Sequence, residues 1–313
     1  MLKQWRYAIL IGLALAITLF ISACGDSGNT ASGTPSSGGN APATLGTPGS
    51  YNCISGSLVA SGSTALAPLV QKVAAAYQAK CSGAHITVQL GGSKTGLANA
   101  EAGSVGIGDS DVPANATTQS DLVDHQVSVV IFAIIVNSKV GVSNLTTAQI
   151  KGIYAGTYTN WKQVGGPDKK IVVVSRPASS GTRATFQKYV LGGPEQIAGP
   201  SSLTTDSTGT VVTNVAQTDG AIGYASTGSA KTNSSVTMVT VDGSAPTAAL
   251  TESNTYKFWN IEHMYTKGQP SQLAQALIDY MASSDGTAAA TALDFVPLAS
   301  MQASAIQAHQ PKS

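Results

Sequence analysis

Three short segments of this 313-residue sequence place small hydroxyl residues and glycine immediately before a helical pattern. They read Ser61-Gly62-Ser63-Thr64, Gly91-Gly92-Ser93-Lys94-Thr95-Gly96 and Ser179-Ser180-Gly181-Thr182-Arg183. A helix start offers unpaired N–H groups and a partial positive charge, hydroxyls add donors, and glycine lets the backbone approach a ligand, so the combination binds oxyanions. One such segment alone is explained more simply as an ordinary helix cap. This chain has three such segments, and Arg176 stands four residues before Ser180 in the third. Together they favour an oxyanion site.

The sequence lacks the motifs of the enzyme classes that these segments superficially suggest. The segment around Lys94 does not have the G-x-x-x-x-G-K-[ST] spacing of a nucleotide-binding loop, and no G-x-S-x-G hydrolase motif occurs. Ser180 as a nucleophile would need a base, and the histidines are scattered: they are His85, His125, His263 and His309. With only 4 histidines and 3 cysteines, neither a histidine-rich nor a cysteine-cluster metal site is expected. We therefore predict a protein without catalysis, metal or cofactor.

The charge content argues against nucleic acid as a partner. Charged residues make up 11% of the chain, against about 25% in an average soluble protein, and the formal net charge is +1. Nucleic-acid affinity depends on many cations that neutralise phosphates, and the sequence has no basic run. Its 42% hydrophobic content is sufficient to form buried cores.

Strand-like and helical patterns alternate from residue 54 onward and must position these segments. Strands are predicted at 54–60, 86–90, 105–108, 127–136 (buried on both faces), 171–174, 221–224 and 236–241. Helices are predicted at 64–80, 95–101, 147–154, 182–190 and 271–281, and the segment 258–265 is mixed in character. This alternation predicts an α/β fold with mostly parallel sheets.

The N-terminus has the pattern of an export signal with a lipid attachment site. Lys3 and Arg6 precede an uncharged apolar run over 7–21, which ends in Ile21-Ser22-Ala23-Cys24 and resembles a bacterial lipobox. We expect a lipoprotein signal peptide at 1–23, a lipidated Cys24, and a flexible Gly/Ser/Thr/Pro tether at 24–50. The alternative is a transmembrane anchor, although about 15 apolar residues fall short of the roughly 20 needed to span a bilayer.

Outside the cytoplasm, Cys53 and Cys81 are free to pair. They flank the first predicted strand–helix unit, whose two ends can lie close together. A disulfide and two buried free thiols both remain open.

The ordered set of motifs resembles the phosphate-binding-protein family of bacterial phosphate ABC transporters. The set is Gly62-Ser63-Thr64-Ala65, Gly92-Ser93, Gly108-Asp109-Ser110-Asp111 and the segment from Arg176 to Arg183, with support from Gly220-Ala221-Ile222-Gly223-Tyr224 and Tyr265-Thr266-Lys267-Gly268. The resemblance covers about residues 54–300 and implies a type II periplasmic-binding-protein fold. Two domains, each a mixed, mostly parallel sheet flanked by helices, would then enclose the ligand in a cleft. We expect domain I at 51–137 plus 259–313 and domain II at 138–258, with crossings near 136–139 and 256–259.

The resemblance also implies a set of phosphate contacts. They are Thr64, Ala65, Ser93, Asp111, Arg176, Ser180, Gly181 and Thr182. Arg176 would supply the guanidinium fork that suits phosphate oxygens. Asp111 would select for phosphate, because a carboxylate only accepts hydrogen bonds and hydrogen phosphate has a proton to donate, whereas sulfate has none. The alternatives are that Asp111 is a capping or turn carboxylate, or that Asp109 takes its place. Some members have an acid two residues after the arginine; this chain has Ala178, which leaves open how Arg176 is oriented.

The resemblance therefore predicts a monomeric, lipid-anchored receptor on the extracytoplasmic face of the membrane, which binds inorganic phosphate and delivers it to an ABC permease. One alternative is a receptor for another tetrahedral oxyanion, namely sulfate, molybdate or arsenate. A second is an extracellular serine phosphatase or esterase that uses Ser180. A third is a sensory or adhesion lipoprotein that has kept the fold.

Overall fold

The computed structural model describes residues 51–196, 202–205 and 207–310. The chain divides into a unit Met1–Ala41 and a unit Pro42–Ser313, and the description below concerns the second. The predicted signal peptide, the lipidation site Cys24 and the tether all lie outside the described residues. Within the described part of the chain, no helix combines the length and the apolar character needed to cross a membrane.

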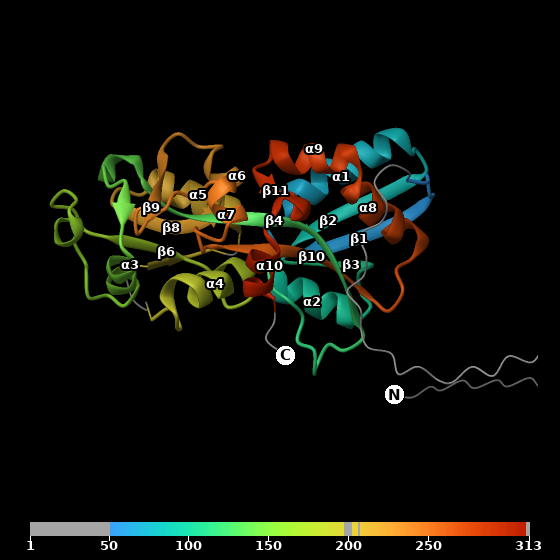
Figure 1. Cartoon of the computed structure of the whole chain (residues 1–313), viewed down its shortest axis with the longest axis horizontal. Coiled ribbons are helices and arrows are strands. Elements are labelled where there is room, and N and C mark those ends of the chain that lie inside the picture. The colour runs from blue at the N-terminus through green and yellow to red at the C-terminus, as the bar shows by residue number, and fades with distance from the viewer. Residues whose placement is uncertain (1–50, 197–201, 206, 311–313) are drawn as a thin grey trace, which may run out of the picture. The chain divides into compact units, whose positions relative to one another are not determined.

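Strands and helices alternate along the described chain, as Figure 1 shows. The strands are β1 Gly56–Gly62, β2 Ala84–Leu90, β3 Ile107–Ser110, β4 Leu122–Asn137, β5 Asn144–Leu145, β6 Val172–Ser175, β7 Ser202–Thr204, β8 Ala221–Ser226, β9 Val236–Val241, β10 Trp259–Lys267 and β11 Phe295–Val296. The helices are α1 Ala67–Lys80, α2 Ser93–Glu101, α3 Thr147–Tyr154, α4 Gly181–Phe186, α5 Thr208–Gln217, α6 Thr227–Ala230, α7 Ala248–Glu252, α8 Gln272–Ala282, α9 Ser284–Ala292 and α10 Ala303–His309. A π-helical turn, Gln187–Leu191, continues α4.

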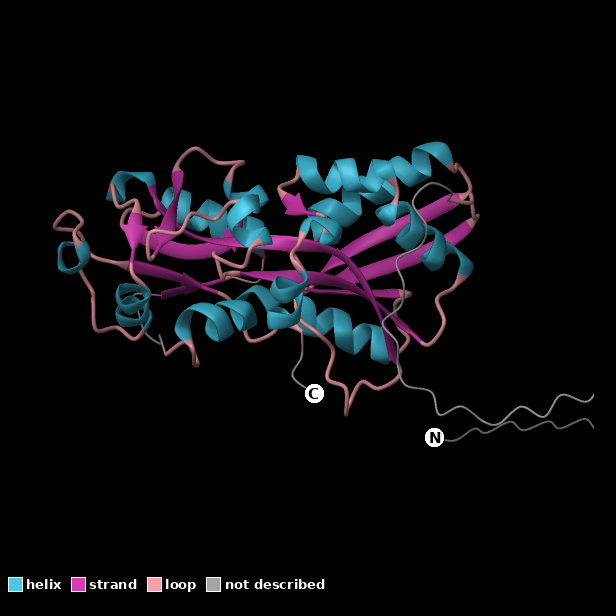
Figure 2. Cartoon of the chain, viewed as in Figure 1, coloured by secondary structure: helices cyan, strands magenta, loops and turns pink. Residues whose placement is uncertain are grey.

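The main sheet has the order β2-β1-β3-β10-β4-β8-β6-β7. Pairing is parallel between β1 and both of its neighbours and between β6 and both of its neighbours, while β10 and β4 are antiparallel to the strands beside them. Helices cover both faces of this sheet (Figure 2). The predicted α/β class with mostly parallel pairing is confirmed.

The long strand β4 takes part in both halves of the sheet. Up to Ile131 its residues pair with β10 and β11, and from Phe132 to Asn137 they pair with β8 and β9. The change of partners coincides with a hydrogen bond from the Phe132 N–H to the Phe258 carbonyl, 3.0 Å long. The sequence predicted a strand buried on both faces over 127–136; residues 128–136 are buried, and Val127 is half-buried.

Several boundaries differ from the predictions for local reasons. Helix α1 begins at Ala67, not at Thr64, because residues 63–65 form a loop in which the Ser63 hydroxyl accepts the N–H groups of Ala65 and Leu66 at 3.1 and 3.0 Å. The segment predicted as mixed in character is the strand β10, whose register with β4 shifts between Glu262 and His263. Helices α5, α6, α7, α9 and α10 and the short strands β5, β7 and β11 were not predicted.

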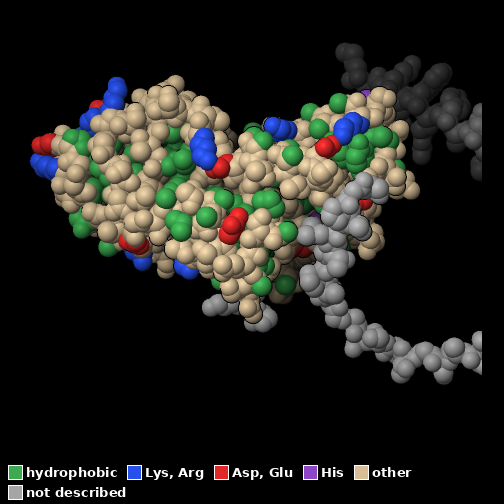
Figure 3. Space-filling view, turned by 45° about the horizontal axis from the view of Figure 1, so that its top comes forward, with side chains coloured by type: hydrophobic (Ala, Val, Ile, Leu, Met, Phe, Trp, Pro, Cys, Tyr) green, Lys and Arg blue, Asp and Glu red, His purple; other side chains and the backbone are tan. Residues whose placement is uncertain are grey.

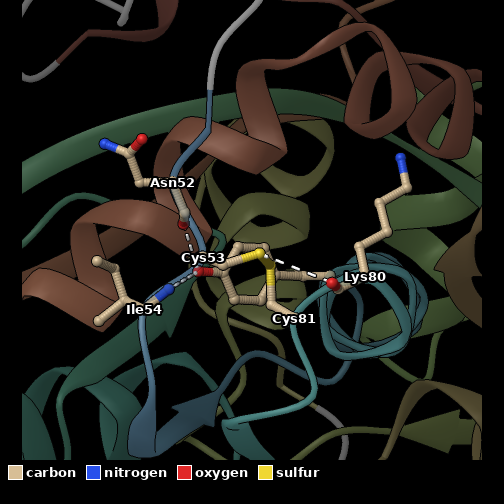
Figure 4. Close-up of a disulfide and its surroundings, with 6 residues drawn as sticks. Asn52, Cys53, Ile54, Lys80 and Cys81 are labelled. Carbon is tan, nitrogen blue, oxygen red and sulfur yellow. Dashed lines mark hydrogen bonds between the residues drawn. A yellow bond between two sulfur atoms is a disulfide. The ribbon is translucent and has the colours of Figure 1, made fainter.

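Cys53 and Cys81 form a disulfide with Cα atoms 5.1 Å apart (Figure 4). It joins the segment that enters β1 to the residue that follows α1. The Tyr77 hydroxyl reinforces this junction, since it accepts the Ile54 N–H at 3.0 Å and donates to the Asn52 carbonyl at 2.7 Å. Of the two states left open by the sequence, the structure has the disulfide.

Candidate functional site

The hydroxyl-rich loops meet where strands from both halves of the sheet end. β1 leads into Ser63 and Thr64, β2 leads into Gly92 and Ser93, and β3 leads into Asp111. The carboxyl ends of parallel strands lie at one edge of a sheet, so these loops become neighbours. From the other half, β6 leads into Arg176, and α4 begins with Gly181 directly after its N-cap Ser180.

Asp111 lies at the centre of this convergence and is almost fully buried. The Ser63 hydroxyl donates to its Oδ1 atom, and the Thr182 hydroxyl donates to Oδ2 at 2.8 Å. The main chain of Asp111 is held as well: its N–H donates to Ser93 Oγ at 3.0 Å, and its carbonyl accepts from Asn260 Nδ2 at 2.6 Å. Asp111 therefore joins the first two loops, strand β10 and helix α4.

The side chain of Arg176 is 1% exposed and is held by hydroxyl groups. Nη2 donates to Thr64 Oγ1 at 3.0 Å, and Nη1 donates to Thr208 Oγ1 at 3.2 Å. The two threonines also contact each other, with hydroxyl oxygens 3.0 Å apart and the Thr208 N–H donating to Thr64 Oγ1 at 3.1 Å. These bonds show that Thr64 and Thr208 help to orient the guanidinium in a chain that has alanine at position 178.

Glycine permits the close approach of the second and third loops. A Cβ atom on Gly181 would lie 2.2 Å from Ser93 Oγ and 2.9 Å from the Asp111 Cβ. Gly92 has a φ of +84°, and a Cβ there would lie 2.9 Å from the Ser179 carbonyl oxygen. The same carbonyl accepts the Lys94 N–H at 3.0 Å, which ties the two loops together.

The Ser180 hydroxyl accepts the Arg183 N–H at 3.2 Å and so caps α4. Arg183 itself is half-buried; it donates to the Arg176 carbonyl at 2.7 Å and forms an ion pair with the buried Glu195, with 2.8 Å between Nε and Oε2. Burial raises the pKa of Glu195, although its hydrogen bonds and the charge of Arg183 oppose that shift. Helix α4 is thus fixed at its start by a polar network.

Two further carboxyl groups are buried beside Asp111. Asp109 lies on β3 and Glu262 on β10, with exposed fractions of 1% and 0%. Burial raises the pKa of Asp109 well above its usual range, and the charge of Asp111 raises it further. Burial also raises the pKa of Glu262 strongly, and the nearby Asp111 and Asp109 add to the shift.

The structure brings together every residue that the sequence predicted as a phosphate contact. These are Thr64, Ala65, Ser93, Asp111, Arg176, Ser180, Gly181 and Thr182, and all of them are buried. Their ligand contacts remain a prediction. Thr208, Asn260 and Glu262 also belong to the site, and they were not predicted from the sequence. Thr208 had a signal, because Ser207-Thr208-Gly209-Thr210 repeats the composition of the other loops before α5.

The arrangement combines one buried guanidinium, several hydroxyls, helix N-termini and one carboxylate. Such a set can bind an oxyanion that carries a proton. Among the described residues, no group of His, Cys, Asp and Glu side chains could hold a metal ion. The buried histidines have other partners: His263 Nδ1 lies 2.8 Å from Asp124 Oδ1, and His309 stacks on Trp259.

Residues 30–285 match the family model described as a PBP superfamily domain. The phosphate-binding protein PstS of Bacillus subtilis is 41% identical over 281 residues, which cover 88% of this chain and 89% of the relative. A phosphate ABC transporter substrate-binding protein from Clostridium perfringens, solved with bound phosphate, superposes with a TM-score of 0.73 at 31% identity, over 78% of this chain and 100% of that chain. An ABC-type phosphate transport receptor from Vibrio cholerae gives a TM-score of 0.63 at 28% identity, over 76% and 99%.

Proposed function

We propose that this chain, which belongs to the PBP superfamily and within it to the PstS family of phosphate-binding proteins, is an extracytoplasmic receptor for inorganic phosphate. It would deliver the bound phosphate to an ABC permease. Proteins of this family are substrate-binding receptors and not enzymes. The observation that carries the proposal is the meeting of Asp111 and Arg176 with three hydroxyl-rich loops in one buried site.

The proposed contacts follow from the chemistry of each group. Arg176 presents its guanidinium to the phosphate oxygens, and the hydroxyls of Thr64, Ser93 and Ser180 act as donors together with the N–H groups of Ala65, Gly181 and Thr182. Asp111 accepts the proton that hydrogen phosphate carries. Sulfate has no such proton, so it would face the carboxylate with two acceptors opposed, at a cost of several kcal/mol.

We also propose that binding closes two lobes. We propose lobes at 51–131 plus 259–313 and at 132–258, and the change of β4 partners after Ile131 and the bond at Phe258 support this division. Its first boundary differs from the expected 137 because it follows the pairing of Phe132–Asn137 with β8 and β9. In this division the Thr64–Arg176 and Asp111–Thr182 bonds connect one lobe to the other, which supports a closed form.

Calorimetric titration of the purified chain with phosphate and with sulfate tests the function. We expect tight phosphate binding and no sulfate response, with arsenate competing because it also carries a proton. Equal affinities for phosphate and sulfate would contradict the role of Asp111. Turnover of a phosphomonoester that disappears in Ser180→Ala would favour the hydrolase alternative instead.

For the N-terminus we propose lipid attachment at Cys24 and a monomeric receptor tethered by residues 24–50. On the face in Figure 3, basic and acidic side chains lie interspersed and form no large basic patch, which fits a protein held near a membrane by a lipid. Cys24→Ser should release the protein from membranes in a fractionation experiment. Retention of this variant in the membrane fraction would contradict lipidation.

A further inference from the structure

Strand β10 directs two buried polar side chains toward Asp111. In its antiparallel pairing with β3, His263 is the partner of Ser110, so the preceding residue Glu262 stands beside Asp111. Side chains alternate along a strand, and Asn260 therefore shares a face with Glu262. Asn260 Nδ2 reaches the Asp111 carbonyl at 2.6 Å, which places this face of β10 against Asp111.

The Glu262 carboxyl is fully buried, and no described residue donates a hydrogen bond to either of its oxygens. The same holds for both carboxyl oxygens of Asp109 within the described ranges. Ser128, the partner of Glu262 on β4, directs its hydroxyl to the Val296 carbonyl at 3.1 Å. An ionised carboxylate in such a place is strongly disfavoured, so the neutral acid is the stable form of Glu262. The raised pKa of Glu262 agrees with this conclusion.

A neutral acid beside a carboxylate has a proton to donate. The Asp111 carboxylate has about four acceptor positions; Ser63 occupies one on Oδ1 and Thr182 one on Oδ2. A bond from Glu262 would occupy a third and would leave one for the proton of a bound anion. Two neighbouring carboxyls can form such a bond only when one of them is protonated.

We propose that Glu262, as the neutral acid, donates a hydrogen bond to the Asp111 carboxylate and thereby keeps Asp111 an acceptor for the proton of the bound anion. Glu262 is then a specificity-determining, positioning residue: it acts on the ligand only through Asp111. The inference rests on the proposed function, because selectivity has meaning only if the chain binds phosphate.

The test compares variants that keep or remove the donor. Glu262→Gln retains an N–H donor and cannot ionise, whereas Glu262→Met has a similar shape and no donor. We expect the Gln variant to bind phosphate within about threefold of wild type and still to reject sulfate. We expect the Met variant to lose about 10- to 100-fold in phosphate affinity, since a hydrogen bond to a charged group is removed, and to show a smaller phosphate-to-sulfate ratio.

The matched control is Glu252→Met, the same exchange at a half-buried glutamate at the end of α7. Thermal melting verifies that each variant folds, and Glu262→Leu, which equally lacks a donor, is measured beside the Met variant. A Met or Leu variant with wild-type affinity and selectivity would overturn the inference. A Gln variant as impaired as the Met variant would also overturn it. Absence of phosphate binding in the wild type would instead refute the proposed function.

Discussion

Thr208 offers the sharpest test of how the arginine of the site is held. It is the first residue of α5 and is fully buried, and its hydroxyl oxygen lies 3.2 Å from Arg176 Nη1 and 3.0 Å from Thr64 Oγ1. Thr208→Val keeps the volume of the side chain and removes both interactions. The bond from the Thr208 N–H to Thr64 Oγ1 is retained, because it comes from the main chain.

The size of the effect follows from the two interactions that are lost. A hydrogen bond to a charged group contributes about 1.5–3 kcal/mol, and one between two hydroxyls about 1 kcal/mol. Water partly replaces the lost hydroxyl, so we take a total of about 2–3 kcal/mol at the lower end of these ranges. The Thr64–Thr208 contact connects the proposed lobes, so its loss falls on the closed, ligand-binding form. The Arg176–Thr208 bond lies within one lobe, and its loss acts on affinity through the orientation of the guanidinium that meets the anion. Phosphate affinity should therefore decrease about 30- to 150-fold.

Isothermal titration of wild type, Thr208→Val and Thr208→Ser with phosphate measures this effect. The serine variant keeps the hydroxyl and should remain within about threefold of wild type. Thr213→Val is the matched control, since Thr213 lies exposed on the same helix and bonds the Gly209 carbonyl at 3.2 Å. If Thr208→Val binds phosphate within twofold of wild type, then the hydroxyl does not orient Arg176 and the reasoning fails.

Three more predictions follow from the site and the disulfide. Asp111→Asn replaces an acceptor oxygen with a donor amide, so calorimetry should show weaker phosphate binding and new sulfate binding; undiminished rejection of sulfate would make Asp111 a structural residue. Asp109→Asn should gain stability relative to wild type as the pH rises above about 4, because the unfolded chain then ionises Asp109 while burial raises the pKa of this carboxyl in the folded form. Thermal melts from pH 4 to 7 measure the difference, and parallel curves would refute it. The double variant Cys53→Ser, Cys81→Ser should lose about 3.5 kcal/mol in denaturant unfolding, from the loop entropy of a 28-residue separation; an unchanged midpoint would show that the bond does not stabilise the fold.

Where an element has strong local signals, the sequence was sufficient to predict it. The bounds of α3 and β9 agree with the predictions, and α3 has a complete capping box formed by Thr146 and Gln149. Helix α5 was missed because three of its four buried positions are valines, which favour strands. Helix α9 is rich in alanine and small polar residues, so no clear apolar face marks it in the sequence.

In the site, too, residues with a local sequence signal were predicted, whereas residues placed by long-range pairing were not. The hydroxyl-rich loops that precede α2 and α4 are visible in the sequence because their composition is unusual. The roles of Asn260 and Glu262 depend on the register between β10 and β3, which pairs residues about 150 positions apart. No local pattern encodes that register. The sequence shows only that Asn260 and Glu262 are polar residues within a segment that also has strand-like apolar residues.

The disulfide has a mechanical consequence for a chain that is pulled from its N-terminal side. A force arriving at Cys53 divides between the entry to β1 and, through the sulfurs, the end of α1. While the bond is intact, the 28-position loop between the cysteines cannot extend, and its reduction would release roughly 95 Å of additional contour length. In a chain pulled from this side, the bond therefore gives the load a second route, through the end of α1, beside the strand from which Ser63 and Thr64 emerge.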